Sequence, residues 1–168
     1  MGSYDIGKKE AVEWIHMTIP KNGEILDVGV CDGKWRYLLS DYPNVDGVEI
    51  FLPNAEKISW AYRTLYICDI YDLAYKHYDL VIFGDMLEHM TVDRAQAVLR
   101  YANEHADNIL IAIPFHYEQD ALYGNPYEVH IQSDLTPEAF EERYPGYTVL
   151  FRAAEDYCYY VKTTKKNI

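Results

Sequence analysis

The sequence predicts a single-domain α/β fold, in which a doubly wound, mostly parallel sheet of seven strands ends in an antiparallel strand and carries helices on both faces. Two observations support this prediction. Apolar segments of strand length alternate with segments of helical periodicity along the chain. The last two strand segments follow each other without a helix between them, which predicts an antiparallel pair. The length of 168 residues fits one domain, residues 1–168, with enough chain for a hydrophobic core.

The first half of the chain is expected to alternate helix and strand, starting with a helix. Residues 5–19, within an N-terminal segment 1–22, have apolar side chains at helical spacing, and Pro20 ends that helix. Pro53 fits the first turn of a later helix. The expected strands are 24–29, 45–50 and 64–68, and the helices between them are 33–41 and 53–63.

The second half continues the alternation and then changes it. Residues 78–84 form a largely apolar run, which is typical of a strand buried on both faces. Thr91 is a plausible N-cap of the next helix. Residues 114–133 have no clear periodicity, and a loop of this length in a compact domain commonly serves a site. The other expected elements are a helix at 91–106, a strand at 108–113, a helix at 136–143, and strands at 147–151 and 156–162.

The charge of the chain argues against an unaided nucleic-acid partner. The 27 acidic and 15 basic side chains give a formal net charge of −12, and an acidic body repels phosphate backbones. Lys162, Lys165 and Lys166 form only a short basic tail, of a kind that is usually solvated.

Cysteine usage and hydropathy favour a cytoplasmic protein. The three cysteines, at positions 31, 68 and 158, include no Cys-x-x-Cys pair, which argues against a disulfide framework or a zinc site and fits a reducing compartment. No apolar run reaches about 18 residues and no signal peptide is visible, so we expect no membrane partner.

Four acidic residues end or follow successive expected strands. Asp27, Glu49 and Asp69 stand at the ends of the first three strands, and Asp85 follows the fourth. Because the carboxyl ends of parallel strands meet at one edge of a sheet, we expect these acids to line one crevice. Glu49 lies 22 residues beyond Asp27, where an acid can accept hydrogen bonds from the hydroxyls of a ribose. Asp69 can accept from the amine of an adenine, or can cap its own turn.

The segment from Asp27 to Gly33 predicts a strand, a tight turn and the start of a helix. Such a junction directs backbone N–H groups and the positive end of the helix dipole toward a nucleotide-type cofactor and its carboxylate. Gly29, Cys31 and Gly33 recur at every second residue, whereas the dinucleotide motif is Gly-x-Gly-x-x-Gly. The spacing therefore disfavours an NAD-dependent oxidoreductase, which stays an alternative.

This turn resembles the first motif of the class I S-adenosylmethionine-dependent methyltransferases, which reads acid-x-Gly-x-Gly-x-Gly, with Cys31 in place of the middle glycine. Val48-Glu49-Ile50 and Cys68-Asp69-Ile70 are similar to the ribose and adenine motifs of that family. Residues 78–90, which contain Leu87-Glu88-His89, resemble the segment after the fourth strand in its small-molecule members. The resemblance covers about residues 24–162 and implies a Rossmann-like fold with S-adenosylmethionine as cofactor.

The resemblance and the strand-end pattern together predict the residues that contact the cofactor. They lie in the first turn, at the ends of the second and third strands, and directly after the fourth strand. They are Asp27, Gly29, Val30, Cys31, Gly33, Glu49, Ile50, Asp69, Ile70, Asp85 and Met86.

The candidate catalytic residues are His130, His116 and Asp85. A base is needed only where the methyl acceptor must lose a proton. His116 follows the fifth strand and His130 lies in segment 114–133, so both can reach an acceptor pocket, although each also fits a polar surface position. The resemblance implies that Glu88 and His89 shape the site.

The three tyrosines of the long segment, Tyr117, Tyr123 and Tyr127, either wall an acceptor site or pack the loop. No set of three carboxylate or amide ligands indicates a metal, so we expect none. The sequence thus predicts methyl transfer to a small-molecule or sugar-type acceptor. The alternative is a non-catalytic module that binds S-adenosylmethionine or S-adenosylhomocysteine.

Overall fold

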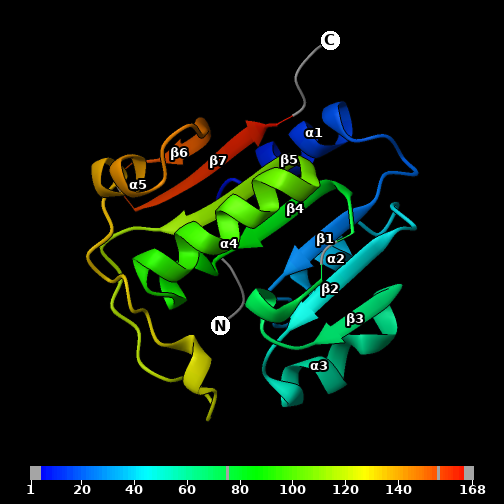
Figure 1. Ribbon diagram of the computed structural model, residues 1–168, viewed down its shortest axis with the longest axis horizontal. Helices are drawn as coiled ribbons and strands as arrows, with labels where there is room; N and C mark the ends of the chain where they lie inside the picture. The colour runs from blue at the N-terminus through cyan, green and yellow to red at the C-terminus, as the bar shows by residue number, and fades with distance from the viewer. Residues whose placement is uncertain (1–4, 75, 155, 165–168) are drawn as a thin grey trace.

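A computed structural model describes residues 5–74, 76–154 and 156–164, and its centre is a seven-stranded sheet in the order β3-β2-β1-β4-β5-β7-β6 (Figure 1). β7 is antiparallel to both of its neighbours, and the other paired strands are parallel. The predicted fold class is therefore confirmed. The strands are β1 (Ile25–Val28), β2 (Val45–Glu49), β3 (Thr64–Ile67), β4 (Tyr78–Gly84), β5 (Ala106–Pro114), β6 (Thr148–Ala153) and β7 (Tyr157–Thr163).

The order of the strands reverses at β1. The chain runs outward from β1 through β2 to β3, and then returns across the sheet to β4 on the other side of β1. In the register, Val28 lies opposite Val48 of β2 and Phe83 of β4. Ligands of open α/β sheets bind at such a reversal, outside the carboxyl ends of the strands.

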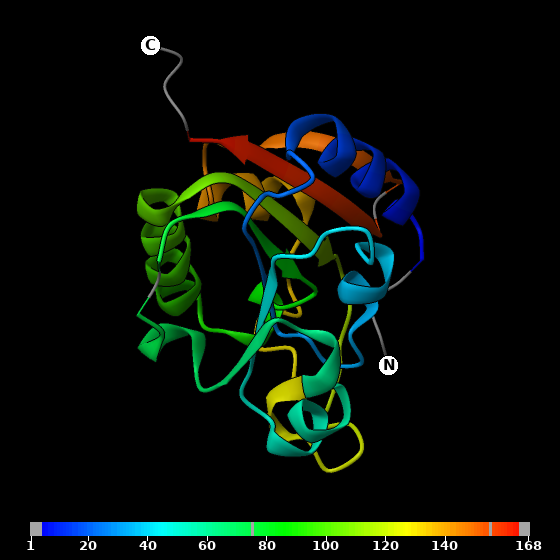
Figure 2. The ribbon, with the colours of Figure 1, turned by 90° about the vertical axis from the view of Figure 1, so that its right-hand side faces the viewer.

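Helices cover both faces of the sheet, and Figure 2 shows α1 and α2 on one side and α4 on the other. The apolar side chains of α1 (Lys8–Thr18), α2 (Lys34–Leu38) and α3 (Leu52–Ile58) belong to one buried cluster. Those of α4 (Val92–His105) and α5 (Pro137–Arg143) belong to a second cluster. Four short 3-10 turns complete the described part of the chain: η1 (Ser59–Ala61), η2 (Ile70–Asp72), η3 (Leu87–His89) and η4 (Pro126–Glu128).

The predicted elements all occur, with shifted ends. The helix expected at 33–41 spans only Lys34–Leu38, and the one expected at 53–63 gives way to η1 after Ile58. Thr91 stands at the N-cap of α4 but makes no capping hydrogen bond, whereas Thr136 Oγ1 accepts one from the Ala139 amide at 3.0 Å.

The predicted basic tail is only partly visible. Lys162 lies in β7, with Nζ 5.2 Å from the ring centroid of Tyr147, and Lys165 and Lys166 lie outside the described residues. Within the described residues, every helix is too short or too polar to cross a membrane.

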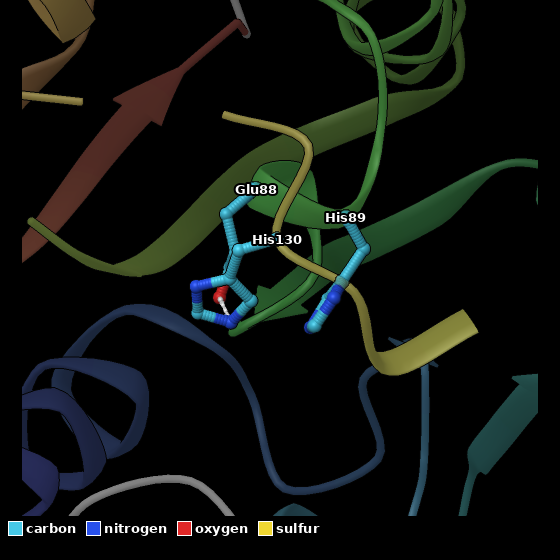
Figure 3. Close-up of side chains that lie close together, drawn as sticks. All are labelled: Glu88, His89 and His130. Atoms are coloured by element: carbon cyan, nitrogen blue, oxygen red, sulfur yellow. Dashed lines mark ion pairs between the residues drawn. The ribbon is translucent and has the colours of Figure 1, made fainter. Parts of the chain in front are cut away.

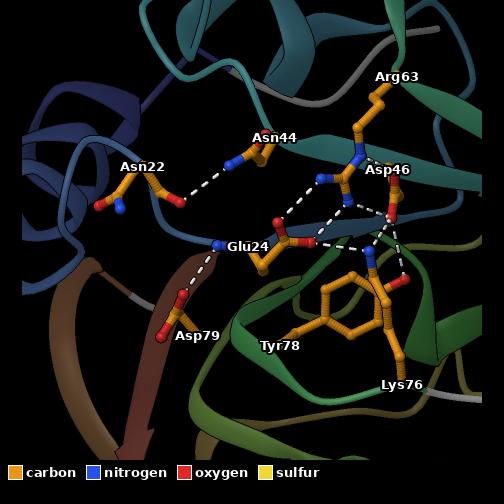
Figure 4. Close-up of polar contacts among 8 residues, drawn as sticks. All are labelled: Asn22, Glu24, Asn44, Asp46, Arg63, Lys76, Tyr78 and Asp79. Atoms are coloured by element: carbon orange, nitrogen blue, oxygen red, sulfur yellow. Dashed lines mark hydrogen bonds and ion pairs between the residues drawn. The ribbon is translucent and has the colours of Figure 1, made fainter.

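The amino ends of the strands carry a network of paired charges, which we call the amino-edge network: Glu24, Asp46, Arg63 and Lys76 (Figure 4). Arg63 donates to Glu24 Oε1 from Nη1 at 2.8 Å and to Asp46 Oδ1 from Nε at 2.8 Å. Lys76 Nζ lies 2.7 Å from Glu24 Oε2 and 2.9 Å from Asp46 Oδ2. Each carboxylate of the network thus meets two cations.

Candidate functional site

A cavity of about 430 Å³ opens at the carboxyl ends of β1, β2 and β4, where the strand order reverses. The turn after β1 lines it together with the ends of β2 and β3, and so do η3 and part of segment 114–133. Figure 1 shows that segment, in yellow, beyond the arrowheads of the strands. The volume lies in the range of small-molecule sites.

The turn after β1 explains the glycine pattern of the sequence. Gly29, Cys31 and Gly33 have φ values of 75°, 46° and 77°, in the left-handed region. A Cβ on Gly33 would lie 2.6 Å from Ile58 Cγ1, so the outer glycine is needed for packing as well. Cys31 accepts this backbone at a cost of about 1–2 kcal/mol, because only glycine visits the region without strain.

The amides of this turn bond within the protein, which corrects the expectation that they face a ligand. The N–H groups of Gly29 and Val30 donate to the Val48 carbonyl at 2.9 and 3.2 Å, and the Cys31 N–H donates to Glu49 Oε2 at 2.9 Å. The helix that follows, α2, has five residues, too few for a substantial dipole at its N-terminus. The turn is therefore fixed to β2, and these amides are not an anion cradle.

Glu49 lies in the cavity wall, as predicted. Its side chain ties the turn together, because Oε1 accepts from the Phe51 amide at 2.8 Å while Oε2 accepts from Cys31. Burial raises the pKa of this carboxyl. An ionised carboxylate has about four lone-pair sites, so Glu49 can accept two further hydrogen bonds from a ligand.

Asp69 also lines the cavity, as do the apolar residues Ile50 and Ile70. Its carboxylate caps η2 by accepting from the Tyr71 amide at 2.9 Å, and it forms an ion pair with Arg94. Both predicted roles, the turn cap and a place in the crevice, thus apply to the same residue.

Asp27 does not line the cavity, which corrects its predicted place in the crevice. The side chain is 1% exposed, and the Tyr62 hydroxyl donates to Oδ2 at 2.6 Å. The other oxygen has no hydrogen-bond partner among the described residues. Burial raises the pKa of Asp27 to about 7. Gly33 likewise lies outside the cavity lining.

Asp85 and Met86 follow β4 and line the cavity, as predicted. Asp85 has a φ of 53°, and its Oδ1 accepts a hydrogen bond from the Tyr157 hydroxyl. The sequence did not indicate that Lys8, a buried lysine of α1, contributes positive charge to Asp85 and Asp27. Burial lowers the pKa of Lys8 to about 8.

Of the two predicted catalytic histidines, the structure brings only His130 into the cavity. His116 is exposed and lies outside the lining, so the geometry gives its catalytic role no support. Tyr117 and Tyr127 line the cavity, whereas Tyr123 is 93% exposed on the surface and does not.

Glu88, His89 and His130 form a cluster on one wall of the cavity (Figure 3). The first two are neighbours in η3, and the third comes from the long segment. Their potential ligand atoms lie within 4.8 Å of one another. Burial lowers the pKa of both histidines and raises that of Glu88 well above its ordinary value. Sequence reasoning missed this cluster, although the Glu-His pair after β4 was its signal.

Comparisons with known proteins show the fold. No family model and no curated protein matches this chain. The N-terminal domain of EvdMO1, solved in the presence of SAH (S-adenosylhomocysteine) and D-fucose, is 16% identical with a TM-score of 0.70, over 98% of this chain and 85% of that one.

Two further solved structures are similar over most of their length. An S-adenosylmethionine-dependent methyltransferase from Clostridium acetobutylicum ATCC 824 is 13% identical, with a TM-score of 0.70 over 91% of this chain and 88% of that one. A TehB-like methyltransferase from Corynebacterium glutamicum ATCC 13032 is 14% identical, with a TM-score of 0.68 over 93% and 88%. The chain therefore has the Rossmann-like fold of these methyltransferases.

Proposed function

We propose that this chain is an S-adenosylmethionine-dependent methyltransferase that acts on a small-molecule or sugar-type acceptor. The observation that carries the proposal is the cavity at the strand reversal, because Glu49, Asp69 and Asp85 line it together with His130. The predicted cofactor side and the predicted acceptor side thus share one cavity.

The residues present fit the proposed cofactor. Glu49 keeps acceptor capacity for ribose hydroxyls, and Ile50 and Ile70 offer apolar surface for the faces of an adenine. Asp69 can accept from the adenine amine at its remaining lone pairs. Gly29, Val30, Cys31 and Met86 complete this side of the cavity.

S-adenosylmethionine would supply a methyl group that is already activated by its sulfonium, so the protein has mainly to align the acceptor. Asp85 accepts a hydrogen bond from Tyr157 and lines the cavity. Tyr117 and Tyr127 provide ring surface on the acceptor side.

The acceptor class rests on charge and on one similar structure. The net charge of −12 opposes a phosphate backbone. The EvdMO1 domain was solved in the presence of D-fucose, which supports a sugar-type acceptor for this chain too.

Calorimetric titration with S-adenosylmethionine and S-adenosylhomocysteine tests the proposal. We expect one site per chain, and an affinity that falls by about 5- to 150-fold in Glu49→Gln, the equivalent of about 1–3 kcal/mol. Glu56→Gln, an exposed glutamate of α3, is the matched control and should bind as the wild type does. No heat at millimolar ligand, or binding of NADH instead, would contradict the proposal.

A non-catalytic cofactor-binding module is the second candidate, and the strained Cys31 at a glycine position favours it. The two functions differ in turnover. Release of S-adenosylhomocysteine from S-adenosylmethionine in the presence of pooled metabolites, lost in Asp85→Asn, would exclude the passive module. The absence of turnover with intact cofactor binding would favour it.

A further inference from the structure

Glu88 is a buried acid for which the described residues provide no adequate partner. The side chain is 1% exposed, and neither carboxylate oxygen has a hydrogen-bond partner among these residues. His130 Nε2 lies 4.0 Å from Oε1, too far for a hydrogen bond. A buried carboxylate is costly unless it is paired or coordinates a metal. Since Glu88 lines the cavity, its missing partner can come from a ligand.

The two neighbouring imidazoles are oriented as metal ligands usually are. Nδ1 of His89 lies 3.1 Å from the Val129 carbonyl oxygen, and Nδ1 of His130 lies 2.8 Å from that of Tyr117. A carbonyl oxygen only accepts, so each Nδ1 carries the proton and each neutral ring has its lone pair on Nε2. Such a backbone hydrogen bond fixes the tautomer and orientation of metal-binding histidines.

The segment that carries His130 is held against η3 by hydrogen bonds that involve none of the three cluster side chains. Gln132 Nε2 donates to the carbonyls of Leu87 at 2.9 Å and Met90 at 3.0 Å. The backbone N–H of Gln132 donates to the backbone carbonyl of Glu88 at 3.0 Å. The cluster is therefore assembled by the fold before any ligand arrives.

We propose that Glu88, His89 and His130 bind one divalent transition-metal ion. Two imidazoles and one carboxylate are a donor set of zinc sites and of non-haem iron(II) sites. Two ligand atoms at about 2.0–2.2 Å from one ion lie at most about 4.4 Å apart. In a tetrahedral or facial arrangement the same bond lengths place two ligand atoms only about 3.0–3.6 Å apart. The ligand atoms of the cluster lie within 4.8 Å of one another, so side-chain movements of about 1 Å would bring them onto one ion. This proposal revises the expectation from the sequence that no metal is present.

Three protein ligands leave positions on the ion open to the cavity, as in catalytic metal sites. Given the proposed function, on which this step rests, the ion would bind an oxygen of the acceptor and lower the pKa of its hydroxyl. The hydroxyl proton leaves to water, and the oxygen forms a bond to the methyl carbon. The carbon–sulfur bond breaks with its electron pair on sulfur, which gives S-adenosylhomocysteine. The acceptor class narrows to hydroxyl-bearing molecules, and His130 becomes a metal ligand in place of a general base.

Titration of the chelator-treated, dialysed full chain with ZnCl₂ and, separately, MnCl₂ tests the site by calorimetry. We expect one tight site for at least one of the two ions, and an affinity at least 100-fold weaker in Glu88→Gln and His130→Gln. His77→Gln and His16→Gln are the controls, because these surface histidines lie 3.0 and 3.3 Å from aspartates and are the competing sites for adventitious ions. The tight site should persist in both controls.

Two results would overturn the metal site. One is wild-type binding of both ions no tighter than that of Glu88→Gln. The other is loss of the tight site in His77→Gln or His16→Gln. If a cluster variant fails to fold, crystals of the wild type soaked in ZnCl₂ decide, since an anomalous peak must lie within about 2.3 Å of all three ligand atoms. Titration of the same sample with S-adenosylhomocysteine separates the two proposals: cofactor binding without metal refutes this one alone, and metal without cofactor refutes the proposed function alone.

Discussion

The pKa values of buried or paired acids shift in opposite directions at the two edges of the sheet. At the amino edge, hydrogen bonds from Arg63 and then Lys76 lower the pKa of Glu24 to about 2. Burial acts to raise the pKa of Asp46, but the same two cations outweigh it and the net direction is down. At the carboxyl edge, burial raises the pKa of Asp27, Glu49 and Glu88.

This difference indicates what each edge does. The amino-edge network is complete within the described chain, so its charges serve stability. Asp27, Glu49 and Glu88 of the carboxyl edge are buried with fewer partners, which destabilises their ionised forms. Buried acids with displaced pKa values in a cavity are typical of functional sites. The proposed cofactor and metal ion would provide partners for Glu49 and Glu88, as Arg63 and Lys76 do for the acids of the amino edge.

The largest expected effect is at the amino edge. Arg63→Ala leaves Glu24 and the buried Asp46 with Lys76 as their remaining cation, so we expect a loss of about 3 kcal/mol in the free energy of unfolding at pH 7. The melting temperature should fall by roughly 6–12 °C. Urea titration measures the change, and Arg100→Ala, at an exposed position of α4, should have little effect.

The loss of stability in Arg63→Ala should depend on pH. The folded pKa of Glu24 is lower than its unfolded value, so its contribution is present above about pH 4.5 and disappears as pH falls toward 2. The difference between wild type and Arg63→Ala should therefore shrink in acid. A difference that stays constant down to pH 2 would show that the ion pairs do not stabilise the fold.

Asp27→Asn should have the opposite sign. The folded pKa of Asp27, about 7, is higher than its unfolded value of 3.8. The ionisation of Asp27 therefore does not lower the free energy of unfolding below about pH 3.8, and lowers it progressively as the pH rises to 7. We expect the variant to be more stable than wild type by about 2 kcal/mol at pH 8 and by much less at pH 4.5. Urea titrations at the two pH values measure the difference in the free energy of unfolding, with the exposed Asp120→Asn as the control. A difference that is equal at both pH values, or equal to that of the control, would show that burial does not destabilise ionised Asp27.

Glu88→Gln is expected to raise the stability of the metal-free protein by about 1–2 kcal/mol, because a neutral side chain of the same shape replaces a buried carboxylate without a hydrogen-bond partner. With bound metal the order should reverse, since only the wild type gains the binding energy. Melting curves with chelator and with ZnCl₂ distinguish the states. Destabilisation in both would indicate a purely structural glutamate.

The smallest effect concerns backbone strain at the carboxyl edge. Cys31→Gly should increase stability by about 0.5–1 kcal/mol, because glycine adopts a φ of 46° without strain. The control is Cys68→Gly, which makes the same change at a residue without a positive φ and should destabilise. Thermal unfolding of the two variants measures the change in stability. A loss of stability in both would show that the backbone at Cys31 is not strained.

Sequence reasoning predicted the elements and the fold class because periodicity and the alternation of strands with helices can be read locally along the chain. It misplaced Asp27 because side chains alternate across a strand: Leu26 and Val28 pack in the cluster on the α4 face, so Asp27 points to the opposite face.

The site depended on contacts that no local pattern carries. The path of segment 114–133 is fixed by distant partners, such as the hydrogen bonds from Gln132 Nε2 to the carbonyls of Leu87 and Met90. This path brings His130 to Glu88 and leaves His116 exposed. The positive charge that Lys8 contributes near Asp85 and Asp27 likewise depends on the packing of α1.

A carbon-13 NMR titration of the side-chain carboxyls tests the contrast between the edges most directly, with Asp27→Asn, Glu88→Gln and Arg63→Ala used to assign the signals. We predict that Glu24 ionises near pH 2 and Asp27 near pH 7 in the ligand-free protein. Carboxyls of both edges that all ionise close to pH 4 would contradict the account.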